Sequence, residues 1–145
     1  MFASLNFLIL MFGRGVIATQ YAWVLEKVGN EAEFYVRLGR SAEYGLKVNL
    51  EIIDDRAKRT LVKEKWSIIM REELSPDHDL IVVSVNHNQL DGVLNFLAPR
   101  INKATILMFN NLWIDPQEVS SILPKDQVVW GFPGAGGGYS FTSTF

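Results

Sequence analysis

The chain has 145 residues, of which 48% are apolar and 21% charged, so it is long enough to form one globular domain of ordinary size. It contains no cysteine, which excludes disulfides, thiolate zinc sites and cysteine nucleophiles; this composition is compatible with the reducing cytoplasm, where we expect the protein to reside. The net charge of −2 gives no basic excess of the kind that binds nucleic acid.

The apolar run at residues 2–12 is interpreted as a buried strand, not as an export signal or a membrane anchor. No positive charge precedes the run, and no small-residue cleavage pattern follows it. Arg14 and two glycines interrupt it well before the roughly 20 apolar residues that a membrane span needs. Residues 6–12 therefore predict a parallel strand covered on both faces, and we expect no association with a membrane.

The hydrophobic pattern then changes period and predicts a helix over residues 15–28, which Gly29-Asn30 would end. Residues 32–36 indicate a second strand, so the first 37 residues predict one strand–turn–helix–strand unit. The partly alternating segments 46–53 and 61–70 predict an inserted antiparallel hairpin or meander, with the polar Asp54-Asp55-Arg56 as a turn between them.

Regular alternation of strands and helices returns after Ser75-Pro76. Strands are predicted at 79–85, 104–109 and 127–131. Helices are predicted at 88–97 and 115–123, the second with Asp115 as N-cap and Pro116 at its first position. The glycine-rich residues 134–138 are expected to have little fixed structure. The order predicts a single α/β domain over residues 1–145, with a doubly wound, mainly parallel sheet, helices on both faces and the inserted hairpin.

The turn after the first strand carries a GxGxxA motif, which is typical of a Rossmann-type dinucleotide site. Gly13 would allow a tight turn, Gly15 would let the backbone approach a pyrophosphate, and Ala18 would permit close packing of helix on strand. The start of the helix would direct its unpaired N–H groups at the phosphates. The predicted pyrophosphate site comprises Gly13, Arg14, Gly15, Val16, Ile17 and Ala18.

The residue at the end of the second strand indicates which cofactor is preferred. An NAD-selective site carries a carboxylate there for the ribose hydroxyls. This chain has Arg37, with Arg40 three residues later, and a guanidinium would pair with a 2′-phosphate. Glu33, earlier in the strand, is expected to lie too far from the ribose. We therefore expect NADP(H) to be favoured over NAD(H).

Polar side chains also follow two later strands, at the edge where ligands bind to doubly wound sheets. Val85-Asn86-His87 follows one strand, and Asn110-Asn111 follows the next. These amides are candidates to hydrogen-bond a nicotinamide, a ribose or a substrate; the alternative is that they cap loops and helices.

Taken together, these motifs resemble the N-terminal domain of ketopantoate reductases (2-dehydropantoate 2-reductases). The resemblance rests on GxGxxA after the first strand, Val36-Arg37, the segment DLIVVSV at 79–85, Asn110 after a strand, and the glycine-rich end. It implies an NADPH-dependent oxidoreductase that reduces a small 2-oxo acid in pantothenate biosynthesis. It also implies that Gln89 lies near the adenine, and Asn110 near the nicotinamide and the substrate.

The resemblance further implies that a C-terminal helical domain, absent from this chain, supplies the catalytic lysine and most substrate contacts. No catalytic residue is therefore assigned here beyond the substrate or nicotinamide contact of Asn110. Two positions differ from the family: Asn86 stands in place of a lysine and Asn111 in place of a glycine. They favour the alternative of a non-catalytic NADP(H)-binding module or sensor. An NAD-linked dehydrogenase and a nucleoside-binding transferase are weaker alternatives.

Other conspicuous residues receive structural interpretations. No metal-ligand spacing links the two histidines to other ligands; His78 is expected to be exposed, and His87 lies near the presumed site. Trp66, Trp113 and Trp130 are expected in the core or at an interface. Apolar surface left by the missing domain is expected to mediate self-association into a homodimer, around residues 112–114 and around Phe132, Tyr139 and Phe141.

Overall fold

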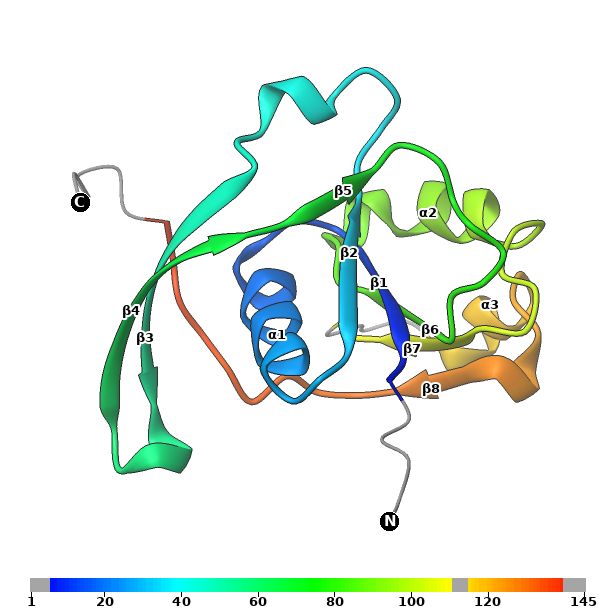
Figure 1. Ribbon diagram of the computed structural model, residues 1–145. Helices are drawn as coiled ribbons and strands as arrows, with labels where there is room; N and C mark the ends of the chain where they lie inside the picture. Colours follow the sequence, from blue (N-terminus) through cyan, green and yellow to red (C-terminus); the bar gives the residue numbers. More distant parts are fainter. Residues whose placement is uncertain (1–5, 111–114, 140–145) are drawn as a thin grey trace, which may run out of the picture.

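The computed structural model describes residues 6–110 and 115–139, and a six-stranded parallel sheet forms its centre (Figure 1). Every pair of neighbouring strands in this sheet runs parallel. In spatial order the strands are β5 (Ile69–Arg71), β2 (Glu31–Tyr35), β1 (Leu8–Phe12), β6 (Leu80–Val83), β7 (Thr105–Met108) and β8 (Val128–Trp130).

The strand order is that of a doubly wound sheet. From β1 the chain moves to β2 and β5 on one side, and it returns to β6, β7 and β8 on the other side. The direction of winding therefore reverses between β1 and β6, and a crevice opens at the carboxyl ends of these strands. The predicted α/β class and parallel sheet are confirmed.

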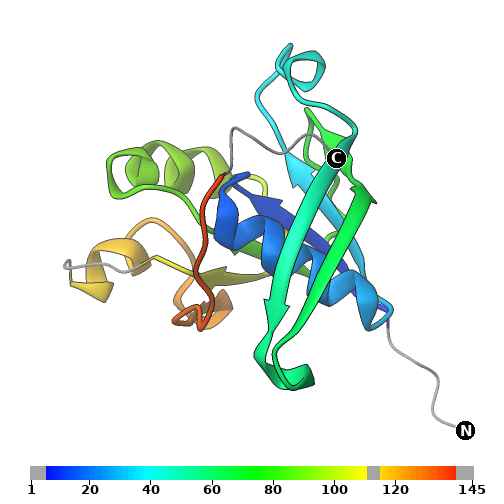
Figure 2. The same cartoon turned by 90° about the vertical axis from the view of Figure 1, so that its left-hand side faces the viewer.

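Helices cover both faces of the sheet, as Figure 2 shows. Helix α1 (Val16–Lys27) packs on one face through Ala18, Ala22 and Trp23. Helices α2 (Leu90–Leu97) and α3 (Pro116–Ser120) pack on the other. Asp115 caps α3 by accepting a hydrogen bond from the Gln117 amide at 2.9 Å, and proline follows it at the start of the helix, as predicted. Short 3-10 turns occur at Ser41–Glu43, Asp55–Ala57, His87–Gln89 and Lys125–Gln127.

The inserted hairpin consists of β3 (Lys47–Asp54) and β4 (Thr60–Ser67), paired antiparallel along eight positions. The hairpin lies across α1, and the side chains of two tryptophans form hydrogen bonds between them. The Trp23 indole donates to Glu64 on the hairpin, and the Trp66 indole donates to Glu26 on the helix, each at 3.1 Å. Trp66 is buried, as predicted, so the hairpin covers the outer side of α1.

The prediction of one continuous strand over 61–70 is wrong. The strand ends at Ser67, and Ile69–Arg71 forms β5, which joins the main sheet parallel to β2. The chain changes sheets at Ile68, whose side chain is buried in the core. A three-residue strand is too short to produce a hydrophobic period of its own, so the sequence pattern did not separate β5 from the hairpin.

His78 is buried, with 5% of its surface exposed, which corrects the expectation that it is exposed. Its Nε2 lies 3.1 Å from the Glu33 carboxylate, and its Nδ1 lies 3.1 Å from the Ser75 carbonyl. Arg71 donates two further hydrogen bonds to Glu33, at 3.0 and 2.9 Å. This cluster connects β2, β5 and the connection that leads to β6, and it uses Glu33 for structure.

We predict that the free energy of unfolding depends on pH through Glu33 and its partners Arg71 and His78. Burial raises the pKa of Glu33, but hydrogen bonds from Arg71 and His78 outweigh burial and hold it below its ordinary value of 4.5. The pKa of Glu33 is lower in the folded state than in the unfolded chain. The stabilisation by Glu33 is therefore complete at a pH above its pKa in the unfolded chain, and it is lost as the pH falls through its pKa in the folded state. In urea unfolding, Glu33→Gln should lower the free energy of unfolding by about 1.5–3 kcal/mol at neutral pH and by less at strongly acid pH. A cost that stays constant across this range would contradict the prediction.

Candidate functional site

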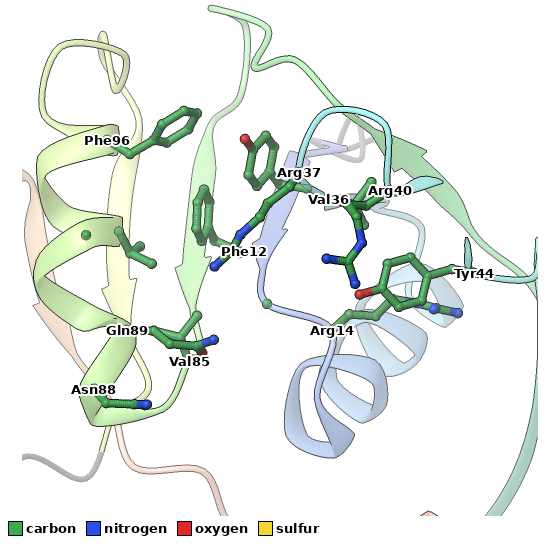
Figure 3. A pocket seen from close by; sticks show the side chains of 14 residues that line it. Phe12, Arg14, Val36, Arg37, Arg40, Tyr44, Val85, Asn88, Gln89 and Phe96 are labelled. Carbon is green, nitrogen blue, oxygen red and sulfur yellow. The ribbon is translucent and has the colours of Figure 1, made fainter. Parts of the chain in front are cut away.

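A cavity of about 780 Å³ opens at the carboxyl ends of β1 and β2, beside α2 (Figure 3). Its volume is in the range of cofactor and ligand sites. The wall is formed by Phe12, Gly13, Arg14, Tyr35, Val36, Arg37, Arg40, Tyr44, Val85, Asn88, Gln89, Gly92, Val93 and Phe96.

Gly13 is required by the close approach of two strand ends. Its φ of +116° disfavours any residue with a side chain. A Cβ at this position would overlap the carbonyl oxygen of Ser84 and lie 3.2 Å from the Val85 side chain. The chain therefore passes from β1 into the turn directly against the end of β6, and the predicted tight turn is present.

Gly15 has a different environment, because a Cβ built there meets nothing within 4 Å. Gly15 occupies the N-cap position of α1, and as a glycine it has no side chain to cap the helix. The first turn of α1 also contains no acidic residue. The first N–H groups of a helix have no partner within the helix, and the positive end of its dipole favours anions. The open space at the Cβ position of Gly15 leaves room for a ligand to approach the uncapped start of α1. Ala18, fully buried between α1 and the sheet, provides the predicted close packing.

Arg37 extends from the end of β2 into the cavity (Figure 3). Among the described residues no carboxylate pairs with it, whereas Arg40 forms an ion pair with Glu43 at 2.5 Å. The described residues that form the cavity wall include no aspartate or glutamate. The wall thus presents a free guanidinium in surroundings that favour an anion.

Arg14 is held at the rim of the cavity by the segment that leads to the hairpin. Its guanidinium lies 4.4 Å from the centre of the Tyr44 ring, a cation–π geometry, and its Nη2 lies 3.5 Å from the Gly45 carbonyl. Burial lowers the pKa of Arg14, while Tyr139 and Tyr44 oppose the change. The side chain of Arg14 is therefore engaged with the protein, and Arg37 is the arginine available to a ligand.

An aromatic group forms another part of the wall. Phe12 and Tyr35 stack with their ring centres 4.7 Å apart, and Phe96 from α2 lies 5.2 Å from Tyr35. Gln89 lies on the same wall, where the family resemblance places the adenine. Sequence reasoning missed the aromatic group, because its members come from two strands and a helix and each fits an ordinary core pattern.

The remaining predicted site residues are distributed unevenly. Val85 lines the cavity, but Asn86 and His87 are exposed and are not part of its wall. Asn110 is buried, and its amide donates a hydrogen bond to the Val85 carbonyl, which joins the ends of β6 and β7. Its Oδ1 has no hydrogen-bond partner in the described part of the chain. Asn111 and residues 112–114 lie outside the described residues, as does Phe141.

No helix within 6–110 and 115–139 has the length and hydrophobicity to cross a membrane. Across the same ranges, no three histidine, aspartate or glutamate side chains gather closely enough to hold a metal ion.

The strand order, the glycine turn and the cavity at the carboxyl ends of the strands define a Rossmann-type nucleotide-binding fold. A family model described as ketopantoate reductase PanE/ApbA matches residues 9–137, and the chain belongs to this family. The resemblance inferred from the motifs is thereby confirmed. No curated protein sequence matches the chain significantly.

Solved structures of dehydrogenases and reductases share this fold. D-mandelate dehydrogenase, solved with NADH and anilino(oxo)acetate, is 20% identical with a TM-score of 0.61; the match covers 86% of this chain and 40% of that one. A putative 2-dehydropantoate 2-reductase from Enterococcus faecalis is 21% identical, with a TM-score of 0.56 and the same coverage. A dimeric ketopantoate reductase from Staphylococcus aureus is 15% identical, with a TM-score of 0.57, and covers 85% of this chain and 41% of its own. The chain thus spans about 40% of the length of these structures.

The two glycines of the turn should respond differently to substitution. We expect Gly13→Ala to lose about 2–4 kcal/mol of unfolding free energy, because the new Cβ overlaps Ser84 and the backbone is strained. Gly15→Ala should lose no more than about 1 kcal/mol, the cost of a poorer N-cap. Chemical denaturation of both variants measures the difference, and equal losses would contradict this account of the turn.

Proposed function

We propose that this chain is the cofactor-binding domain of an NADPH-dependent oxidoreductase that reduces a small 2-oxo acid. The observation that carries the proposal is the free guanidinium of Arg37 on a wall without carboxylates, beside an open glycine turn. A 2′-phosphate distinguishes NADP(H) from NAD(H), and an unpaired arginine at the end of the second strand is the feature that selects it.

Each part of the site has a proposed task. The backbone from Gly13 to Ala18 would hold the diphosphate at the start of α1, and Arg37 would pair with the 2′-phosphate. The aromatic group and Gln89 would enclose the adenine. Asn110, whose buried Oδ1 has no hydrogen-bond partner among the described residues, would lie near the nicotinamide, as the family resemblance implies. When bound, NADPH supplies the hydride for the substrate carbonyl; the protein supplies orientation and electrostatics.

The substrate and the catalytic groups are proposed from the family alone. Because the chain spans about 40% of the related structures, we assign to it the cofactor-binding part of the enzyme. A 2-oxo acid of pantothenate biosynthesis and a cytoplasmic location are the corresponding proposals. The second candidate is a non-catalytic NADP(H)-binding module, which is favoured by Asn86 at the position where the family resemblance implies a lysine. Oxidation of NADPH by the full-length protein on addition of 2-oxo acids would support the reductase, and binding without oxidation the module.

A fluorescence titration tests the cofactor assignment. We expect NADPH to bind more tightly than NADH, and Arg37→Ala to weaken NADPH binding about 10- to 100-fold, the value of one or two charge-assisted hydrogen bonds. Arg37→Glu should weaken it further and leave NADH nearly unaffected. Arg56→Ala, which removes an arginine from the tip of the hairpin, is the matched control and should change neither affinity. Equal affinities of the wild-type chain for both cofactors would defeat the NADP(H) assignment.

We also propose that the β8 edge is a contact between copies of the chain. Apolar side chains gather there: Val129, Trp130 and Phe132 are 46%, 39% and 82% exposed. In the described sheet β8 pairs only with β7, so its other edge is open to a further strand. Light scattering should show a mass that rises with concentration, and Phe132→Lys should reduce it. A constant monomer mass at high concentration would remove this proposal.

A further inference from the structure

The glycine-rich segment 131–139 has no helix or strand, yet it is attached to α1 by hydrogen bonds. Gly134 donates its amide to the Tyr21 hydroxyl at 2.9 Å, and Gln20 donates its side-chain amide to the Gly136 carbonyl at 3.1 Å. The Tyr139 hydroxyl donates to the Arg14 carbonyl at 2.7 Å. The segment, red in Figures 1 and 2, thus follows α1 back toward its first residue and ends at the glycine turn.

One glycine of this segment, Gly137, lies close against α1. A Cβ at Gly137 would lie 2.8 Å from the Gln20 amide nitrogen and 3.0 Å from a Val16 methyl group. Both distances are shorter than ordinary contacts, so a larger residue here would require the Gln20 and Val16 side chains to shift. The expectation of little fixed structure at 134–138 is therefore incomplete: these residues bring Tyr139 to the turn.

We infer that Tyr139 is a positioning residue for the diphosphate-binding turn, an inference that rests on the proposed function. The peptide group between Arg14 and Gly15 is planar and trans, so its carbonyl and its N–H point in opposite directions. Because Tyr139 holds the Arg14 carbonyl, the Gly15 N–H points away from the segment. The space beside Gly15 is open, and its amide is one of the groups that would hold the diphosphate.

Two segments far apart in the sequence contact Arg14. Tyr44 and Gly45 hold its guanidinium, and Tyr139 holds its backbone carbonyl. The Tyr139 side chain is 64% exposed and is not part of the cavity wall, so it acts through the turn and not by touching the ligand. A fixed peptide orientation lowers the ordering cost of binding a phosphate, which is the general benefit of preorganisation.

Tyr139→Phe tests the inference, because it removes the hydroxyl and keeps the ring. We expect it to weaken NADPH binding about fivefold, the value of one hydrogen bond. Binding of adenosine 2′-monophosphate, which has the 2′-phosphate but no diphosphate, should be unchanged. In nuclear magnetic resonance spectra the Gly15 amide signal should shift in the free protein. The matched control is Tyr21→Phe, which removes another hydroxyl contact of the same segment, away from the turn, and should alter NADPH binding less.

The outcomes separate this inference from the proposed function. If the wild-type chain binds neither NADPH nor adenosine 2′-monophosphate, the proposed function fails, and the inference with it. If the wild-type chain binds NADPH and Tyr139→Phe binds it equally well, the inference alone is overturned. An equal loss in Tyr21→Phe, or an equal loss for adenosine 2′-monophosphate, would also overturn it, because the effect would then belong to the packing of the whole segment.

Discussion

The architecture of the site depends on the contact between the carboxyl ends of β1 and β6. Gly13 lies so close to the Ser84 carbonyl that no side chain fits between them. This contact occurs where the winding of the sheet reverses, so the chain leaving β1 and the chain leaving β6 diverge toward opposite faces. The divergence opens the crevice, and the turn after Gly13 places the start of α1 at its edge. A bulkier residue at this position would move the turn, the helix and the cavity together.

The charges around the cavity show which cation is available to a ligand. Three arginines contribute to its wall, but two of them are already engaged: Arg14 with Tyr44 and Gly45, and Arg40 with Glu43. Glu33, the carboxylate within β2, is engaged with Arg71 and His78 and is not part of the cavity wall. Among the described residues, Arg37 is the arginine of the wall whose side chain has no such partner. The cofactor preference proposed here therefore follows from how the surrounding charges pair, as much as from the arginine itself.

Helix α1 is stabilised on three sides, which explains how an uncapped helix start can be held in place. The sheet covers one side through Ala18 and Ala22, and the hairpin covers another through the paired indole–carboxylate hydrogen bonds of Trp23 and Trp66. The segment 131–139 lies along a third. Such bracing compensates for the absence of an N-cap side chain, and it leaves the first amides of the helix free for an anion.

The sequence by itself determined the local features: the period of each main strand and helix, the glycine turn, the Asp115 cap and the arginine after the second strand. These depend on residues close together in the chain, where steric and hydrogen-bonding preferences act directly. Tertiary structure alone decided that Ile69–Arg71 leaves the hairpin for the main sheet, that His78 is buried against Glu33, and that Phe12, Tyr35 and Phe96 share one wall. It also decided that Tyr139 reaches Arg14 across 125 positions. Each of these depends on packing between distant segments, and the residues involved have no local pattern that distinguishes them from ordinary core or loop residues.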